Sequence, residues 1–342
     1  MKLFILVTLF FVYSSASSDG LAMPDHHGPI SVMGDHTHNK GEYMFSYRIM
    51  KMEMNSIYNG NKSMSIDSVM SSPNSASDNS GTYMNAPKSM KMDMHMFGMM
   101  YAPSDKITLT LMTSYLEKEM TQQRMRMAGG SKFDVNSNGF GDTKFSALIG
   151  LKKSPDYDSH FGLGFSFPSG SIDKRDNTPM SDSARLGYNM QNGSGTYDFN
   201  FLINNVLKFG KSRLGNQVSF KLPVSGKNRN GYRYDKDFDL TFWFSQRFVD
   251  FISGSLKLNY EYRGEIKGFD NQMNKRMSPA MDSRNYGFQK LNLGLGVNLV
   301  NHNDFLKNHR LSIEFIVPIT QKFNGIQMAD SCRLILGWMY GF

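Results

Sequence analysis

The chain of 342 residues contains a single cysteine, Cys332, and two tryptophans. One thiol cannot form an internal disulfide, so packing and hydrogen bonds must hold the fold. Apart from residues 3–13 the sequence has no long apolar run, whereas a transmembrane helix needs about 20 apolar residues. Stretches with helical periodicity are scarce as well. These absences argue against a disulfide scaffold and a helical membrane protein, and they favour an all-β fold.

Charge of one sign is not concentrated anywhere, although the formal net charge is +8. No nucleic-acid-binding module is present, so we expect no nucleic-acid partner. The N-terminus has Lys2, an apolar run and then Ser14-Ser15-Ala16, which is typical of a secretory signal peptide. We therefore predict a signal peptide at 1–16, a periplasmic histidine-containing segment at 17–40 and one large domain at 41–342.

Methionine is abundant, with 27 residues, and part of it is regularly spaced. In residues 89–101, methionines at positions 90, 92, 94 and 96 alternate with lysine, aspartate, histidine and phenylalanine. A period of two is the signature of a β-strand with two different faces. Residues 43–54 show the same alternation, with methionine at 50, 52 and 54. We predict that these two segments are neighbouring strands.

Ten further segments alternate apolar and polar residues, which gives twelve predicted strands. The twelve predicted strands, including the two methionine-rich ones, are 43–54, 89–101, 107–115, 145–151, 161–167, 197–203, 214–222, 238–244, 256–262, 291–299, 311–319 and 334–342. Long and short connections alternate between them, and aromatic residues gather near the strand ends. A soluble β-sandwich also alternates, but it does not require this rhythm. We therefore predict an antiparallel transmembrane β-barrel of about 12 strands.

The location and orientation of the barrel follow from the need to close the sheet and from the even number of strands. Lipid offers no hydrogen-bond partners to an open sheet edge, so the last strand has to pair with the first. We expect a barrel in the outer membrane of a Gram-negative cell, surrounded by its lipid, with both ends of the barrel chain in the periplasm. The terminal Phe342 matches the aromatic signal that the barrel assembly machinery reads. The loops expected outside the cell are 55–87, 117–141, 168–194, 224–236, 264–285 and 320–330.

Two motifs carry a family resemblance. The stretch Met33–Glu42 and the stretch Met92–Asp105 resemble outer-membrane proteins of the MetA-pathway-of-phenol-degradation family, whose members are labelled transporters. The resemblance extends over most of the chain after the signal peptide. It implies a barrel with a transport role and supplies no catalytic residues.

The predicted function is a porin-like channel or transporter for small solutes, with hydrophobic or aromatic compounds as one class. The predicted inward face carries charges of both signs, which we assign as pore-lining. These residues are Arg48, Lys144, Asp198, Lys221, Asp239, Lys257, Glu261, Arg263, Glu314 and Arg333. Polar side chains inside a barrel either line a path for solutes or pair with one another and fill the lumen. The sequence does not decide between these two alternatives.

A first alternative function is binding or transport of a soft metal such as copper or silver. The predicted faces turn a set of methionines inward, and thioethers favour Cu(I). The candidate ligands are Met50, Met52, Met54, Met90, Met92, Met94, Met96, His36 and His38. Methionine is also a flexible apolar filler, and histidines in a polar exported segment are commonly solvated. Copper is thus the one cofactor that the pattern suggests.

A second alternative is a lipid hydrolase embedded in the barrel. His160 and Ser166 fall on one predicted strand face, but six residues of extended chain separate them. At about 3.3 Å per residue this distance excludes a direct hydrogen bond. We find no nucleophile elbow, phosphate loop or cysteine-based metal spacing, so we assign no catalytic residue and predict that the protein is not an enzyme.

Overall fold

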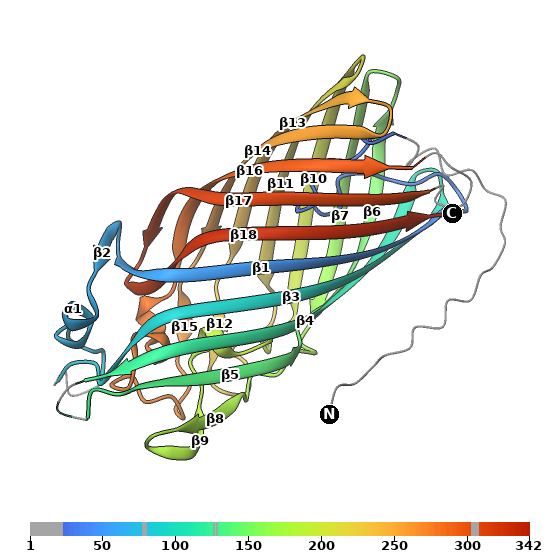
Figure 1. Ribbon diagram of the computed structural model, residues 1–342. Helices are drawn as coiled ribbons and strands as arrows, with labels where there is room; N and C mark the ends of the chain where they lie inside the picture. Colours follow the sequence, from blue (N-terminus) through green and yellow to red (C-terminus); the bar gives the residue numbers. More distant parts are fainter. Residues whose placement is uncertain (1–22, 77–80, 126, 128, 302–307) are drawn as a thin grey trace, which may run out of the picture.

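The computed structural model describes residues 23–76, 81–125, 127, 129–301 and 308–342. Within them, twelve antiparallel strands form a closed barrel, which confirms the predicted fold (Figure 1). The strands are β1 (Tyr43–Asn59), β3 (Asn85–Ser104), β4 (Ile107–Arg124), β6 (Thr143–Lys153), β7 (Tyr157–Phe167), β10 (Asp198–Phe209), β11 (Ser212–Pro223), β13 (Asp237–Val249), β14 (Ile252–Arg263), β16 (Phe288–Val300), β17 (His309–Phe323) and β18 (Ile326–Gly341). The predicted signal peptide, 1–16, lies outside the described residues.

The barrel closes between its first and last strands. β1 pairs with β18 from Met44 opposite Gly341 to Asn59 opposite Ile326. All other barrel neighbours are consecutive along the chain, in the order of a simple meander. The C-terminus therefore lies beside the start of β1, at the end of the barrel that carries the short turns (Figure 1). We call this the short-turn end and the opposite one the long-loop end.

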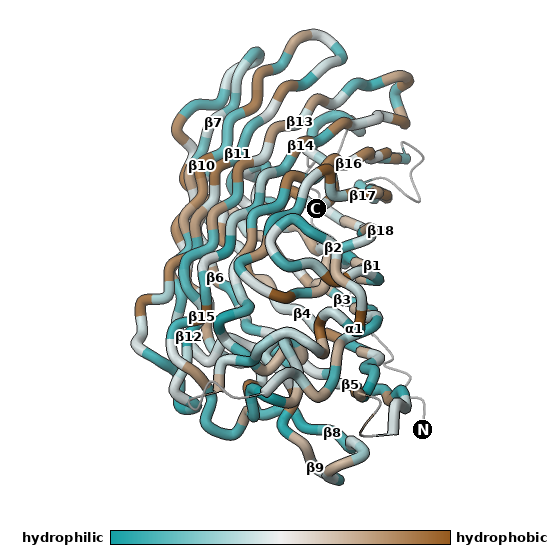
Figure 2. Tube along the Cα trace, turned by 90° about the vertical axis from the view of Figure 1, so that its left-hand side faces the viewer, coloured by the Kyte–Doolittle hydropathy of each residue, from teal (hydrophilic) through white to brown (hydrophobic). Residues whose placement is uncertain are grey.

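Along the strands, the outward side chains are mostly apolar, whereas many of the inward ones are polar or small. On β13, Phe242 and Phe244 are exposed while Thr241, Trp243 and Ser245 are buried in the interior. The same alternation appears as brown and teal segments along the strands in Figure 2. An exposed apolar belt around a closed sheet is the surface of a barrel that spans a lipid bilayer. In the described part of the chain, no helix is long and apolar enough to cross a membrane.

One wall of the barrel is taller than the other. The adjacent strands β17, β18, β1, β3 and β4 have 15 to 20 residues, whereas the remaining seven have 11 to 13. A bilayer needs only about 9–11 residues per strand. The tall wall therefore projects beyond the lipid at the long-loop end.

Two predicted loops are wrong for this reason. In place of the loop 320–330, β17 continues to Phe323 and β18 begins at Ile326, so only two residues connect them. In the predicted loop 117–141, β4 continues to Arg124 and the added strand β5 (Lys132–Phe140) pairs with it. Beyond the lipid both faces of a strand meet polar surroundings, so pairing persists without apolar alternation. Most of the connection between β16 and β17 lies outside the described residues.

Small elements in the long connections cover the long-loop end. Viewed from that end, loop segments cross the interior of the ring of strands (Figure 2). The elements are β2 (Lys62–Met64), α1 (Ile66–Met70), β8 (Arg175–Thr178), β9 (Ser181–Arg185), η3 (Tyr188–Met190), β12 (Tyr232–Tyr234), β15 (Ile266–Gly268), η4 (Pro279–Met281) and η5 (Ser283–Asn285). η3, β12, β15 and η4 share an apolar cluster centred on Tyr188, Tyr232, Ile266 and Met273, whereas β2 and α1 pack in a second cluster with Val69 and Tyr83. This packing joins separate connections into one cover.

Candidate functional site

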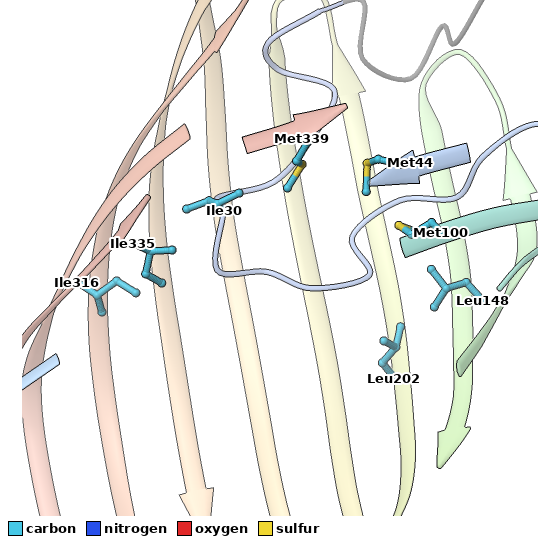
Figure 3. Close-up of a cluster of buried hydrophobic side chains, with 8 residues drawn as sticks. All are labelled: Ile30, Met44, Met100, Leu148, Leu202, Ile316, Ile335 and Met339. Atoms are coloured by element: carbon cyan, nitrogen blue, oxygen red, sulfur yellow. The ribbon is translucent and has the colours of Figure 1, made fainter. Parts of the chain in front are cut away.

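Residues 23–42 lie inside the barrel, where they form a plug (Figure 3). Ile30, which is 2% exposed, packs against a cluster that includes Met44 and Met100 from neighbouring strands and Met339 and Ile335 from β18. The expectation that the histidines of this segment are solvated is wrong. His27 is 2% exposed and His38 is 1% exposed.

Polar side chains of the barrel wall satisfy the irregular backbone of the plug. Each donates a hydrogen bond to a plug carbonyl, as the absence of helix or sheet pairing there requires. The pairs are His160 with Gly34 (2.8 Å), Asn204 with Asp35 (2.9 Å), Gln217 with Met33 (3.1 Å), Ser253 with Pro24 (2.7 Å) and Arg310 with Gly28 (3.0 Å). The donors come from β7, β10, β11, β14 and β17, so the plug is held from many sides of the barrel.

Ion pairs fix the plug at its start. The carboxylate of Asp25 is fully buried and lies 3.1 Å from the Arg213 guanidinium and 3.4 Å from that of Arg247. These arginines belong to β11 and β13, which are neighbours in the barrel. Because a buried carboxylate is costly without a partner, this pairing favours the inserted position of the plug.

Histidines and carboxylates gather within the plug. His36 Nδ1 lies 2.7 Å from Asp35 Oδ1 and 3.1 Å from His27 Nδ1. On its other side, His36 Nε2 lies 3.3 Å from His38 Nε2, and His38 Nδ1 lies 3.2 Å from Glu42 Oε2. The predicted ligands His36 and His38 are thus brought together, and the structure adds His27 and Asp35 to them.

Burial controls the charge of these histidines. It lowers the pKa of His27 well below its usual value, and the charges of His36 and Arg310 act in the same direction. It also lowers the pKa of His36, although Asp35 acts in the opposite direction. Both imidazoles therefore favour the neutral form, which has a free nitrogen lone pair.

Burial acts in the opposite direction on the two carboxylates of the cluster. Burial alone would raise the pKa of Asp35, but its contacts with His36 outweigh this effect and bring the pKa below its usual range. Burial likewise would raise the pKa of Glu42, but hydrogen bonds from His38 and Asn39 lower it. The cluster therefore combines ionised carboxylates with neutral imidazoles.

A cavity of about 530 Å³ lies in the lumen toward the long-loop end. One wall consists of inward methionines of β1 and β3, as the alternation predicts. The register places these thioethers directly opposite one another: Met50 with Met94, Met52 with Met92 and Met54 with Met90. We call these six residues the methionine ladder. Met96 also points inward, but it lies opposite Arg48 and outside this cavity.

Charged groups form another wall of this cavity, and tyrosines of the cover close it. Arg333 pairs with Glu261 at 2.7 Å and also with Asp330, which lies 2.9 Å from Lys290. Tyr188, Tyr234 and Tyr286 line the cavity from the connections. The cavity therefore offers thioethers, aromatic rings and paired charges to a ligand.

The predicted pore-lining residues all lie on the lumenal side, and most of them are paired. Arg48 is buried and donates to the Met33 sulfur of the plug, and Lys144 lines a small cavity of about 40 Å³. Asp239 lies inward on β13 between outward neighbours. The other predicted residues form the pairs Lys221–Asp198 (2.9 Å), Lys257–Glu314 (2.7 Å), Arg333–Glu261 (2.7 Å) and Arg263–Asp237 (3.1 Å). Pairing within the lumen and lining of the large cavity therefore occur together.

A second lumenal cavity, about 460 Å³, lies toward the short-turn end. The plug lines it with Asp35, His36 and Glu42, and the barrel contributes Lys153 and Lys208 among others. The plug contributes to this cavity but not to the larger one. The two cavities thus lie on different sides of the plug.

The comparisons with known proteins fit this architecture. No family model matches the chain, and no curated protein matches it. The fold is that of a solved outer-membrane channel. The chain is similar to the COG4313 outer membrane channel from Pseudomonas putida F1, with 11% identity over 92% of this chain and 100% of that chain and a TM-score of 0.61.

Two other solved structures are more distant. A Pseudomonas aeruginosa FadL homologue has 8% identity over 95% of this chain and 98% of that chain, with a TM-score of 0.40. The CymD monoaromatic hydrocarbon channel has 6% identity over 89% of each chain, with a TM-score of 0.41.

The residues considered for hydrolysis are not assembled into a catalytic pair. The His160 ring N–H donates to the carbonyl of Gly34 in the plug, and the Ser166 hydroxyl accepts from the Asn200 amide. On β7 their positions lie opposite Asn204 and Asp198 of β10, six residues apart. His160 therefore acts as an anchor of the plug.

Proposed function

We propose that this protein is a channel of the outer membrane for small solutes, and that the cavity of about 530 Å³ holds the solute on its way through. The observation that carries this proposal is the position of the cavity. It lies inside a closed membrane barrel, between the plug and the cover of the long-loop end. Its volume falls in the range of small-molecule sites.

The lining of the cavity points to small amphipathic solutes, such as aromatic compounds with a polar or charged substituent. The methionine ladder gives one adaptable, polarisable wall, and thioethers contact aromatic rings favourably. The pairs around Arg333 give another wall that can bind a polar group. The resemblance to the MetA-pathway-of-phenol-degradation family implies transport but no particular solute, and we propose that the chain is a distant member.

Passage requires the plug to move within the barrel. It is held by separate hydrogen bonds rather than by sheet pairing, so a local rearrangement leaves the barrel strands intact. Such a segment can change position more readily than a strand, because fewer cooperative contacts have to break. In the proposed mechanism, solute in the large cavity displaces the plug toward the short-turn end.

Liposome swelling with a panel of small neutral, aromatic and charged solutes tests the proposal. We expect uptake above that of protein-free liposomes. The double substitution Asn204→Ala/Gln217→Ala, which removes two hydrogen bonds to the plug, should increase it. Asn205→Ala is the matched control, because Asn205 is next on β10 and bonds Asn216 of β11. If neither the native chain nor the double variant passes any solute, the channel function is wrong.

A second candidate function is soft-metal binding by the methionine ladder. It is favoured by the three directly opposed thioether pairs that line the large cavity. Directly opposed side chains in antiparallel strands have Cβ atoms about 4.5–5.5 Å apart, so two sulfurs can reach one ion. Thioether ligands select Cu(I) and similar ions. Binding of Cu(I) or Ag(I) to the purified barrel tests this function.

Phe342 has a proposed role in assembly as well as in packing. Its ring lies 5.4 Å from that of Tyr43 and 5.5 Å from that of Tyr340, and its backbone N–H donates to Tyr43. We infer that the barrel assembly machinery recognises this aromatic end before β18 pairs with β1. The short-turn end then faces the periplasm and the long-loop end faces outward.

A further inference from the structure

The side chains of Asp35, His36, His38 and Glu42 form a continuous series of close contacts. The three contacts are Asp35 Oδ1 to His36 Nδ1 (2.7 Å), His36 Nε2 to His38 Nε2 (3.3 Å) and His38 Nδ1 to Glu42 Oε2 (3.2 Å). Imidazole nitrogens without a proton and carboxylate oxygens both present lone pairs, which are what a metal ion binds.

The carboxylates at the two ends are already engaged as acceptors. Asp35 Oδ2 accepts the backbone N–H of Gly28 at 2.7 Å. Glu42 accepts the backbone N–H and the side-chain amide of Asn39 at 2.9 and 3.0 Å. When Glu42 accepts from His38 Nδ1–H, His38 Nε2 can accept from His36 Nε2–H. His36 Nδ1 is then a potential metal-ligand atom, 2.7 Å from Asp35 Oδ1.

A third potential metal-ligand atom, from another part of the plug, lies close to Asp35 and His36. His27 Nδ1 lies 3.1 Å from His36 Nδ1 and 3.8 Å from Asp35 Oδ2. His27, Asp35 and His36 each offer one ligand atom, and these atoms all lie within 4.8 Å of one another. Ligands at 2.0–2.1 Å from a tetrahedral metal are separated by about 3.3 Å. The observed separations of 2.7 to 3.8 Å bracket that value.

We propose that His27, Asp35 and His36 bind a divalent transition-metal ion of the Zn²⁺ type, with solvent as the fourth ligand. Two imidazoles and one carboxylate are a donor set suited to Zn²⁺ with an open position. The site is distinct from the methionine ladder, which lines the other cavity.

The surroundings support this assignment in two ways. His38 and Glu42 form an outer chain that receives the second N–H of His36, as partners of metal-bound histidines commonly do. Asp35 and His36 also line the cavity of about 460 Å³, which gives an ion and a water access from the short-turn end. Since His27 and Asp35 lie eight positions apart, the ion would join two limbs of the plug. Metal would thus stabilise the inserted plug.

The test uses the whole barrel in detergent, stripped with a chelator and then titrated with Co²⁺ and Zn²⁺. We expect one high-affinity ion per chain and a visible Co²⁺ spectrum typical of tetrahedral nitrogen and oxygen ligands. His27→Gln, Asp35→Asn and His36→Gln should each lose that spectrum and weaken binding by more than tenfold. His38→Gln should weaken it about 10–100-fold, since it removes an outer partner only.

Matched controls separate this site from general binding by histidine or methionine. His26→Gln changes the histidine next to His27, and His95→Gln changes one on the other side of the sheet that bonds Tyr47. Both should keep the Co²⁺ spectrum, as should a variant with four ladder methionines replaced by leucine. A native barrel that takes up no ion, or equal binding by His27→Gln and His26→Gln, would overturn the proposal. Metal uptake by the native barrel tests the proposal even if a ligand variant fails to assemble. Metal binding is measured without solute conduction, so its outcome is independent of the proposed channel function.

Discussion

Lys257 of β14 and Glu314 of β17 form a 2.7 Å ion pair inside the barrel, and the Glu314 carboxylate also accepts the backbone N–H of Ser31 at 2.9 Å. The two side chains are 4% and 0% exposed. They reach each other across β16 because Gly294 lies between them. A Cβ at that glycine would approach Glu314 Oε1 to 2.6 Å and Lys257 Cε to 3.0 Å. The ion pair of the barrel wall, Gly294 beside it and Ser31 of the plug thus pack together as one unit.

The first prediction concerns the stability of this unit. Lys257→Met leaves the Glu314 carboxylate buried without its charge partner, which typically costs 3–5 kcal/mol, so we expect a loss of about 3 kcal/mol. The free energy of unfolding in urea, followed by heat-modifiable mobility on gels, measures it. Lys257→Met/Glu314→Leu should recover much of the loss, because apolar replacement of both partners removes the buried charge.

An exposed ion pair of the same length provides the control. Lys51 lies 2.7 Å from Asp93, and their side chains are 54% and 32% exposed. Lys51→Met should therefore change stability by less than about 1 kcal/mol. Equal losses in Lys51→Met and Lys257→Met would contradict the view that burial makes the Lys257 pair important.

The barrel could be predicted from the sequence because lipid selects one face of every strand. Along β13 the outward Phe242 and Phe244 alternate with the inward Thr241 and Ser245, and this polarity reports which side meets lipid, although Trp243 also points inward. That signal disappears where strands leave the bilayer, as in β5, where Asn136 and Asn138 are exposed and Ser137 is buried in the lumen. The extensions of the tall wall were missed for this reason.

The plug was missed for a different reason. It has no regular secondary structure, so no periodicity marks it, and its anchors read as ordinary lumenal polar residues. Asn204 and Gln217 show their role only when Asp35 and Met33 are placed opposite them. The available signal is the apolar group Ile30, Val32 and Met33 among polar residues, since apolar side chains in an exported segment need a place to be buried. The histidine cluster depends on this insertion, and no spacing in the sequence shows that Asp35 joins the histidines.

The second prediction concerns orientation in the membrane. Asp67 on α1 is exposed at the long-loop end, and Pro155 is exposed in the short turn between β6 and β7. In a Cys332→Ser background, a membrane-impermeant thiol reagent added to intact cells should label Asp67→Cys and not Pro155→Cys. Both sites should react after the outer membrane is permeabilised. Strong labelling of Pro155→Cys in intact cells would reverse the assigned orientation.

The third prediction separates packing from recognition at Phe342. Phe342→Ala removes the ring contacts with Tyr43 and Tyr340 but keeps the backbone hydrogen bonds to Tyr43. If assembly machinery reads the aromatic ring, the amount of heat-modifiable barrel in cells should fall severalfold while export is unchanged. The purified variant should still refold in detergent, where no machinery acts. Tyr340→Ala removes a neighbouring ring contact and serves as the control for packing, and an equal cellular defect in it would argue against specific recognition.

The last prediction tests the methionine ladder as a soft-metal site. Replacing Met50, Met52, Met92 and Met94 by leucine keeps the apolar volume and removes four sulfurs from two opposed pairs. Such swaps usually cost less than 1.5 kcal/mol each, so the barrel should still assemble. We expect the native protein to bind Ag(I), used as a redox-stable substitute for Cu(I), and the variant to lose this binding.

The control for that experiment changes methionines that lie elsewhere. Met99 and Met180 are exposed outside the cavity, so replacing both by leucine should leave Ag(I) binding unchanged. Equal Ag(I) binding by the native chain and the ladder variant would show that the thioethers act only as an adaptable apolar wall. In that case the ladder should still influence the uptake of aromatic solutes, because leucine lacks the polarisable sulfur that contacts a ring.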